Sequence, residues 1–201
     1  METYKQQFIE FMVASDALTF GEFVTKSGRQ TPYFINSGNF ADGPRISQLG
    51  EWYARAINDR IGSGCDNLYG PAYKGIPLAV TTAAALWNLF QHRVTYTFNR
   101  KEEKTHGEKG ALVGHRYVGG EKVLIIEDVV TAGTSVRESL TLLKAIADVE
   151  IVGVIVSVDR QERGQGERSA LDELQDELGI QTCAIVTLDE IIEFLDGREI
   201  A

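Results

Sequence analysis

The sequence predicts an α/β protein, with a mostly parallel sheet of about five strands, helices on both faces and a small N-terminal hood. Segments 123–126 and 151–158 are almost continuous apolar runs rich in β-branched residues, which is typical of strands buried on both faces of a parallel sheet. Such runs alternate with segments of helical periodicity, and the strand–helix–strand order forces right-handed crossovers. A chain of 201 residues is the length of one ordinary globular domain, so we expect a single domain over 1–201.

Composition argues against several classes of function. The formal net charge of −9 disfavours non-specific binding of nucleic acid, which requires a basic face. No apolar run approaches the ~20 residues of a membrane helix, and the N-terminus lacks the apolar core of a signal peptide. Cys65 and Cys183 are isolated, which favours reduced core thiols over a disulfide framework or a zinc site. We therefore expect a cytoplasmic protein with neither a nucleic-acid nor a membrane partner.

The front section, about residues 1–40, shows no α/β alternation and is expected to form a hood beside the main sheet. Its predicted elements are a helix over about 2–14, a strand over 18–25, a basic turn over 26–30 and an extended segment over 31–38. Phe34 and Ile35 have two interpretations: they pack into the core, or they form the apolar wall of a base-binding pocket. Spacing alone favours the core.

The middle section begins the alternation. We expect a helix over 44–61, a strand over 67–69, a turn rich in Gly and Pro over 70–77, a helix over 75–91 and a strand over 94–98. Backbone N–H groups face solvent in a turn of this kind, and Lys74 adds a cation. The residues alone leave open whether this is an anion-binding loop or a plain connection with a surface lysine.

Segment 99–121 changes in character, because it is rich in glycine and in basic side chains and has little to anchor it to a core. The basic residues are Arg100, Lys101, Lys104, His106, Lys109, His115 and Arg116. A loop of this length inside a compact domain is usually functional or disordered. It is either a solvated surface hairpin or, as we favour, a mobile cationic lid that closes over a polyanion.

The central unit is the strand over 122–126, followed by two acids, a small hydroxyl-rich turn and a helix. A buried strand has no use for adjacent acids, so Glu127 and Asp128 should emerge at its carboxyl end. The carboxylates can accept hydrogen bonds from sugar hydroxyls or hold a hard cation such as Mg²⁺.

The turn over 131–135 is suited to phosphate. A helix start presents unpaired N–H groups to an anion, Ala132 and Gly133 permit close approach, and Thr131, Thr134 and Ser135 add hydroxyl donors. Phosphate, sugar diol and Mg²⁺ together describe an activated ribose phosphate. The alternative is an ordinary helix start capped by Thr134, which does not explain the paired acids.

A last strand over 150–158 delivers Asp159 and Arg160 to its carboxyl end, where ligands gather in open α/β sheets. Arg160 can hold a carboxylate bidentately, or it can form a surface ion pair with Asp159 or Glu162, which the residues alone favour. A helix over 169–179, a strand over 181–187 and a helix over 188–196 complete the chain and carry no functional signal.

Five motifs resemble those of known enzymes. The run 122–135 is similar to the signature with which phosphoribosyltransferases bind 5-phosphoribosyl 1-pyrophosphate (PRPP). Four further motifs resemble the orotate phosphoribosyltransferases, in the order of that family: 26–38, 73–78, 100–107 and 159–164. The resemblance covers essentially the whole chain. It implies the type I phosphoribosyltransferase fold and the reaction of orotate with PRPP to give orotidine 5′-phosphate and pyrophosphate, in the synthesis of UMP.

The resemblance also implies roles for particular residues. Binding of PRPP is implied for Lys26, Tyr73, Lys74, Arg100, Lys101, Lys104, His106, Glu127, Asp128, Val129, Val130, Thr131, Ala132, Gly133, Thr134 and Ser135. Binding of orotate is implied for Phe34, Ile35, Thr131 and Arg160, and catalysis for Lys101, Lys104 and His106.

Other family features follow from the same resemblance. It implies a cis peptide at Ala72–Tyr73, Mg²⁺ held mainly by PRPP near the acid pair, and a homodimer in which the loop reaches the neighbouring subunit's site. The chain departs from the family pattern at Ile35, where many relatives have a second Phe, and at Glu103, where some have a small residue. Two alternatives stay open: a phosphoribosyltransferase for another nucleobase, and a non-catalytic PRPP-binding regulator.

Overall fold

The structure is a computed structural model that describes residues 1–24, 30–101, 110–131, 133–162 and 168–197. Its helices are α1 (Thr3–Ala14), α2 (Gly43–Arg60), α3 (Gly75–Phe90), α4 (Thr134–Ile146), α5 (Ala170–Leu178) and α6 (Leu188–Leu195), with a 3₁₀ turn η1 (Ser37–Asn39). Its strands are β1 (Leu18–Val24), β2 (Gln30–Ile35), β3 (Asn67–Tyr69), β4 (Thr95–Asn99), β5 (Leu112–Gly114), β6 (Lys122–Ile126), β7 (Glu150–Asp159) and β8 (Gln181–Thr187).

The main sheet confirms the predicted fold class. Within the described ranges it has six strands in the order β5-β4-β3-β6-β7-β8. Five of them, β4, β3, β6, β7 and β8, pair in parallel, as predicted. The sixth, β5, pairs antiparallel with β4 and was not expected, because it lies inside the segment 99–121 that we interpreted as a loop.

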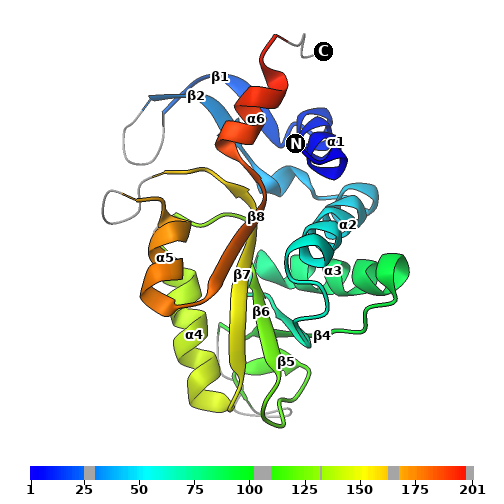
Figure 1. Cartoon of the computed structure of the whole chain (residues 1–201), viewed down its shortest axis with the longest axis vertical. Helices are drawn as coiled ribbons and strands as arrows, with labels where there is room; N and C mark the ends of the chain where they lie inside the picture. Colours follow the sequence, from blue (N-terminus) through cyan, green and yellow to red (C-terminus); the bar gives the residue numbers. More distant parts are fainter. Residues whose placement is uncertain (25–29, 102–109, 132, 163–167, 198–201) are drawn as a thin grey trace.

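Strand β6 shows why the central run must be apolar throughout. Leu124 and Ile126 contribute to a core that includes residues of α1, α2, α3 and α6. Val123 and Ile125 point to the opposite face and pack with residues of α4 and α5. The two pairs of helices α2–α3 and α4–α5 lie on opposite sides of the sheet (Figure 1). Residues on both faces of β6 are therefore removed from water.

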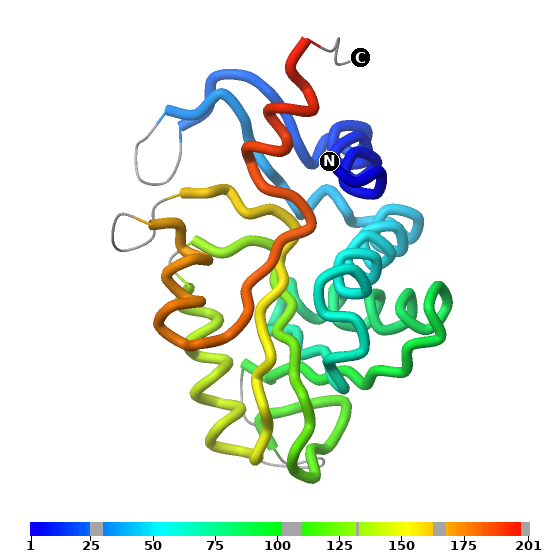
Figure 2. Tube along the Cα trace, viewed as in Figure 1, coloured from blue at the N-terminus to red at the C-terminus, as the bar shows by residue number. Residues whose placement is uncertain are grey.

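The N-terminal section forms its own small sheet, in which β1 and β2 pair antiparallel. This sheet lies beyond the carboxyl ends of the main strands, with α1 and α6 beside it (Figures 1 and 2). Lys5 of α1 is buried and its Nζ lies 2.5 Å from Oε1 of Glu190 in α6, so the first and last helices are joined. Cys65 in the core and Cys183 at its edge are free thiols, as predicted.

Residues 110–121 are anchored, contrary to the expectation of one unanchored loop over 99–121. Tyr117 donates a hydrogen bond to Oδ1 of Asn67 at 2.8 Å, and Leu112 and Tyr117 pack against the core. The Glu121 carboxylate accepts from two backbone N–H groups of the preceding turn. Residues 102–109 lie outside the described residues. In the part of the chain that the structure describes, none of the helices is both long and apolar enough to cross a membrane.

Candidate functional site

The two predicted phosphate loops meet where the order of the strands reverses. Strands β3 and β6 are neighbours, and the chain continues from β3 to β4 on one side and from β6 to β7 on the other. The loops that leave their carboxyl ends run to α3 and α4, which cover opposite faces of the sheet (Figure 1). Such a switch point is where open α/β sheets bind ligands. Both predicted phosphate loops begin here.

Lys74 and Asp128 bring the two loops together. Asp128 is buried, and its Oδ2 accepts hydrogen bonds from Lys74 Nζ and from Ser37 Oγ, both at 2.7 Å. Lys74 Nζ also donates to Ser37 Oγ at 3.0 Å. Ser37 belongs to η1, which follows the hood, so three separate segments converge on one carboxylate. Sequence analysis did not single out Ser37, because one serine in an extended motif carries no signal.

Glu127 is also buried, with 8% of its surface exposed. Burial raises the pKa of its carboxyl group, and a hydrogen bond donated by Ser135 Oγ to Glu127 Oε1 opposes that rise. The first residues of α4 therefore hold the first acid of the pair. Because the Glu127 carboxyl group is already desolvated in the folded protein, replacing the Ser135 hydroxyl by another hydrogen-bond donor would add little further desolvation cost.

Two buried hydroxyl groups hold the main chain of the acid pair. The hydroxyl of Tyr53 in α2 donates to the carbonyl of Glu127 at 2.6 Å. Ser157 Oγ in β7 donates to the carbonyl of Asp128 at 2.6 Å. Sequence analysis missed both residues. Ser157 carried a signal, since it is a polar residue in an otherwise apolar strand, whereas a tyrosine on the apolar face of a helix looks like ordinary core.

The turn before α4 has the form expected of an anion site. Gly133 is the N-cap of α4 with φ of 71°, and no side chain caps the helix. The alternative of a helix start capped by Thr134 is therefore wrong. Unpaired N–H groups at a helix start attract anions. Thr131 and Thr134 are exposed here, Val129 and Val130 are half-buried, and Ala132 lies outside the described residues.

The loop after β3 contains the predicted cis peptide, Ala72–Tyr73. The N–H of Ala72 donates to Oδ1 of Asn99 at 2.8 Å, which ties this loop to the end of β4. Tyr73 is 70% exposed, and Lys101 Nζ lies 5.5 Å from the centre of its ring, within range of a cation–π contact. Lys101 thus lies beside the loop from which Lys74 reaches Asp128.

Three of the predicted basic residues cannot be placed, whereas Arg100 can. Lys26, Lys104 and His106 lie outside the described residues. The backbone N–H of Arg100 donates to the carbonyl of Ala111 at 2.7 Å, at the base of the loop.

The predicted base-binding residues separate. Phe34 is 50% exposed, and its ring stacks on that of Phe23 with 5.5 Å between the ring centroids. Ile35 points the other way and packs against the core. Arg160, after β7, donates through Nη2 to Glu162, as the ion-pair interpretation expected. Its Nε is buried and has no partner among the described residues. Spacing favoured the core for both Phe34 and Ile35, and that prediction is correct for Ile35 and wrong for Phe34.

The acid pair suits a cation that arrives with its own ligands. Across the described ranges, no group of three or more His, Cys, Asp or Glu side chains could hold a metal ion. Mg²⁺ is commonly held by one or two carboxylates together with substrate phosphates and water, and Glu127 and Asp128 supply two carboxylates. A cavity of about 600 Å³ between β5 and α4 is lined in part by His115 and Arg116 but by none of the residues predicted to bind PRPP or orotate.

Comparison with known proteins identifies the family. Residues 36–184 match the phosphoribosyl transferase domain. The orotate phosphoribosyltransferase of Clostridium acetobutylicum is 54% identical over 200 residues, which is 100% of this chain and 89% of that protein. That of Thiobacillus denitrificans is 50% identical over 196 residues, 98% of this chain and 90% of that protein.

A solved structure agrees with these relatives. The crystal structure of orotate phosphoribosyltransferase from Francisella tularensis has a TM-score of 0.85 and 38% identity, covering 96% of this chain and 91% of that chain. The adenine phosphoribosyltransferase of Thermoanaerobacter pseudethanolicus, at a TM-score of 0.54 and 15% identity, shares the fold alone. The chain belongs to the orotate phosphoribosyltransferase family.

Proposed function

We propose that this protein transfers the phosphoribosyl group of PRPP to orotate, giving orotidine 5′-phosphate and pyrophosphate in the synthesis of UMP. The observation that carries the proposal is the meeting of Lys74 and Asp128 at 2.7 Å, from the two loops of the switch point. The uncapped start of α4 lies on the same loop as Asp128. Membership of the family supports the choice of substrates.

The structure suggests how PRPP would bind. The start of α4 and the hydroxyls of Thr131, Thr134 and Ser135 would take the 5′-phosphate. A helix dipole supplies only about 0.3–1 kcal/mol, so the N–H and hydroxyl donors do most of this binding. Asp128 would exchange the ammonium group of Lys74 for ribose hydroxyls. Lys74, once released, would turn to the pyrophosphate.

The chemistry follows from the charges. Breaking the bond between C1 and the pyrophosphate leaves a cationic ribose and a highly charged leaving group. Lys74, Arg100 and Lys101, with Lys104 from the undescribed part of the loop, would stabilise that anion electrostatically. The acid pair would lie near the positive charge on the ribose. Mg²⁺ bound with PRPP beside Glu127 and Asp128 would neutralise part of the phosphate charge.

Orotate carries a carboxylate, and the proposal assigns its recognition to Arg160. A guanidinium binds a carboxylate through two parallel N–H bonds, so Arg160 would exchange Glu162 for the substrate. The exposed ring of Phe34 would stack on the base, and Thr131 would contact it. Ile35 would support Phe34 from the core side.

We further propose that the protein is a cytoplasmic homodimer in which the loop carrying Lys104 and His106 completes the partner's site. Family resemblance supports this arrangement. Subunits with Lys104→Ala, mixed with subunits with Asp128→Asn, should recover activity in proportion to the mixed dimers formed. Mixed dimers without recovered activity would contradict sharing.

The test of the reaction is the loss of orotate absorbance in the presence of PRPP and Mg²⁺. We expect a loss that a chelator abolishes, and no consumption of uracil or adenine by the same protein. Consumption of another base in place of orotate would make the protein a different phosphoribosyltransferase. Binding of PRPP without turnover of any base would make it a PRPP-binding regulator.

A further inference from the structure

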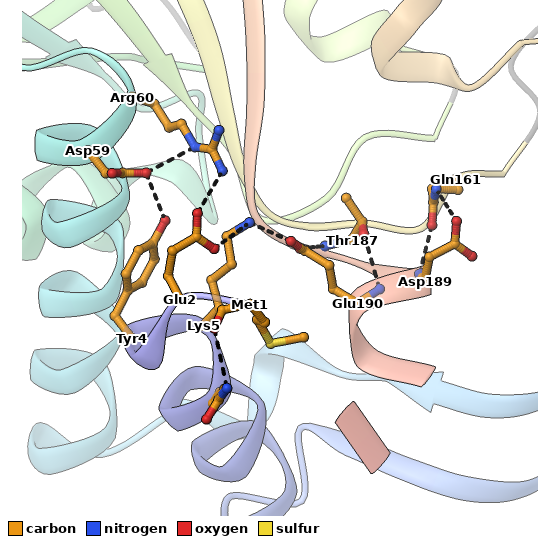
Figure 3. Close-up of polar contacts among 11 residues, drawn as sticks. Met1, Glu2, Tyr4, Lys5, Asp59, Arg60, Gln161, Thr187, Asp189 and Glu190 are labelled. Atoms are coloured by element: carbon orange, nitrogen blue, oxygen red, sulfur yellow. Dashed lines mark hydrogen bonds and ion pairs between the residues drawn. The ribbon is translucent and has the colours of Figure 1, made fainter. Parts of the chain in front are cut away.

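The turn that carries Arg160 is fastened to the last helix. Gln161 follows Arg160, and its Nε2 donates to Oδ2 of Asp189 at 2.9 Å. The N–H of Asp189 donates in return to Oε1 of Gln161 at 2.8 Å. Both polar atoms of one side-chain amide are thereby used by a single residue in the first turn of α6 (Figure 3). We name these two residues the Gln161–Asp189 pair.

The main chain around Arg160 is held on both sides. Asp159 is the last residue of β7 and pairs in register with Thr187 of β8. Its Oδ1 accepts from the N–H of Gln161 at 2.9 Å, and Gln161 has a φ of 50°. That left-handed conformation is uncommon for a residue other than Gly, Asn or Asp. The chain therefore turns sharply after Arg160 and is closed onto the junction of β8 and α6.

The first turn of α6 is itself a firm support. Thr187 and Glu190 form a capping box, in which the Thr187 hydroxyl accepts from the N–H of Glu190 and the Glu190 carboxylate accepts from the N–H of Thr187. The other oxygen of Glu190 binds Lys5 of α1 at 2.5 Å. The adjacent acids thus have different tasks: Glu190 holds α6 to the hood, and Asp189 holds Gln161 (Figure 3).

Arg160 needs such support, because bidentate binding of a carboxylate by the guanidinium depends on the position of the main chain that carries it. Its side chain can already reach Glu162, which competes with any substrate carboxylate. A displacement of about 1 Å in a positioning element can cost on the order of 100-fold in rate. Without the contacts to α6, the turn could shift, and Arg160 could stay paired with Glu162 at a position where it does not reach the substrate.

We propose that Gln161 and Asp189 are positioning residues for Arg160 and thereby set the affinity for the carboxylate-bearing base. This proposal rests on the proposed function, since Arg160 is the group that would bind orotate. Neither residue needs to touch a substrate. The pair acts by fixing the turn in which Arg160 lies, and α6 becomes part of the apparatus for base recognition.

The test is a set of steady-state measurements with orotate and PRPP varied separately. Gln161→Glu removes the donor and sets two carboxylates against each other. We expect the KM for orotate to rise about tenfold, the scale of losing one or two hydrogen bonds of a positioning element, while the KM for PRPP stays within about twofold. Should this variant not fold, Gln161→Met, which has the same length and no amide, takes its place.

A double variant separates positioning from general damage. Gln161→Glu combined with Asp189→Asn gives the pair a new donor on α6 and a new acceptor on the turn, so the KM for orotate should return to within about threefold of the wild type. Glu190→Gln is the matched control on the same helical turn, because it weakens the contact with Lys5 and leaves the Gln161–Asp189 pair intact. It should lower the melting temperature without changing the KM for orotate.

Each other outcome overturns the proposal. An unchanged KM for orotate in Gln161→Glu, an equal rise in both KM values, or a folded double variant without recovery would show that the pair has no positioning role. If Arg160→Ala raises the KM for orotate and Gln161→Glu does not, this proposal alone fails. If the wild-type protein does not consume orotate, the proposed function fails, and the assignment of Arg160 fails with it.

Discussion

The buried hydroxyl of Tyr53 offers a quantitative test of how the acid pair is held. Its ring is fully buried, and the hydroxyl donates to the carbonyl of Glu127 at 2.6 Å. Burial, and secondarily the charge of Asp128, raises the pKa of Tyr53 well above its ordinary value, so the group stays a donor at any working pH. Tyr53→Phe removes that donor and leaves a buried carbonyl unsatisfied, which costs about 1–3 kcal/mol.

The expected result has two parts. The free energy of unfolding in urea should fall by about 1–3 kcal/mol, and the melting temperature by about 2–4 °C for each kcal/mol in a chain of this size. The KM for PRPP should rise, because the released main chain no longer fixes the direction of Glu127 and Asp128. The KM for orotate should change less.

Tyr4→Phe is the matched control. The Tyr4 hydroxyl lies 3.4 Å from Oδ2 of Asp59 at the surface, and its loss should cost no more than about 0.5 kcal/mol. If Tyr53→Phe is as stable as Tyr4→Phe, or if it is less stable but binds PRPP as the wild type does, then the Tyr53 hydroxyl does not position the acid pair.

Three further predictions concern the same site. Lys74→Ala should change the free energy of unfolding by at most about 1 kcal/mol, because a largely exposed lysine contributes little to folding through its pairing with Asp128. The same variant should weaken PRPP binding about tenfold or more in a calorimetric titration. Binding equal to that of the wild type would contradict the role of Lys74. Gly133→Ala should cost on the order of 1–2 kcal/mol in urea unfolding, because φ is 71° and a Cβ atom would lie 3.0 Å from Cδ2 of Leu174; an unchanged midpoint would argue against a strained turn. Burial raises the pKa of Glu127 in the folded protein, so the stabilisation from its protonated form is present below the ordinary carboxyl pKa and is lost as pH rises through the raised pKa. Glu127→Gln should flatten the dependence of the melting temperature on pH in that window, and an unaltered pH profile would contradict the raised pKa.

Periodicity and composition were sufficient to predict most of the framework. The run 123–126 is apolar on both faces because helices cover both sides of β6, and that single fact places it at the centre of a parallel sheet. Strand β5 escaped prediction because three residues have no resolvable period, and its pairing with β4 is a tertiary contact that no local pattern indicates.

The site was predictable only as separate pieces. Lys74 and Asp128 are 54 residues apart, and each was assigned from its own loop at the carboxyl end of a strand. Parallel pairing of β3 with β6 then brings these ends together. No local pattern indicates that the hydroxyl of Tyr53 reaches a particular carbonyl, because such a contact is decided by the docking of α2 against the sheet.

The last helix shows the same limit more clearly. We saw no functional signal in 188–196, and the capping residues there looked like an ordinary helix start. The structure places Asp189 against Gln161, 28 residues earlier in the chain, so its importance depends on a tertiary contact. Ile35 is the opposite case, because spacing favoured the core for both Phe34 and Ile35, and the structure agrees for Ile35 but leaves Phe34 50% exposed.

The most direct test of the central claim is the affinity of PRPP for Asp128→Asn, measured by calorimetric titration beside the wild type. The variant keeps the size of the side chain and one acceptor oxygen, and it removes the charge at the switch point. We expect PRPP binding to weaken about tenfold or more, the scale of losing one charge-assisted hydrogen bond, with a melting temperature close to that of the wild type. Full PRPP affinity in a folded variant would contradict it, because the acid pair would then not hold the sugar.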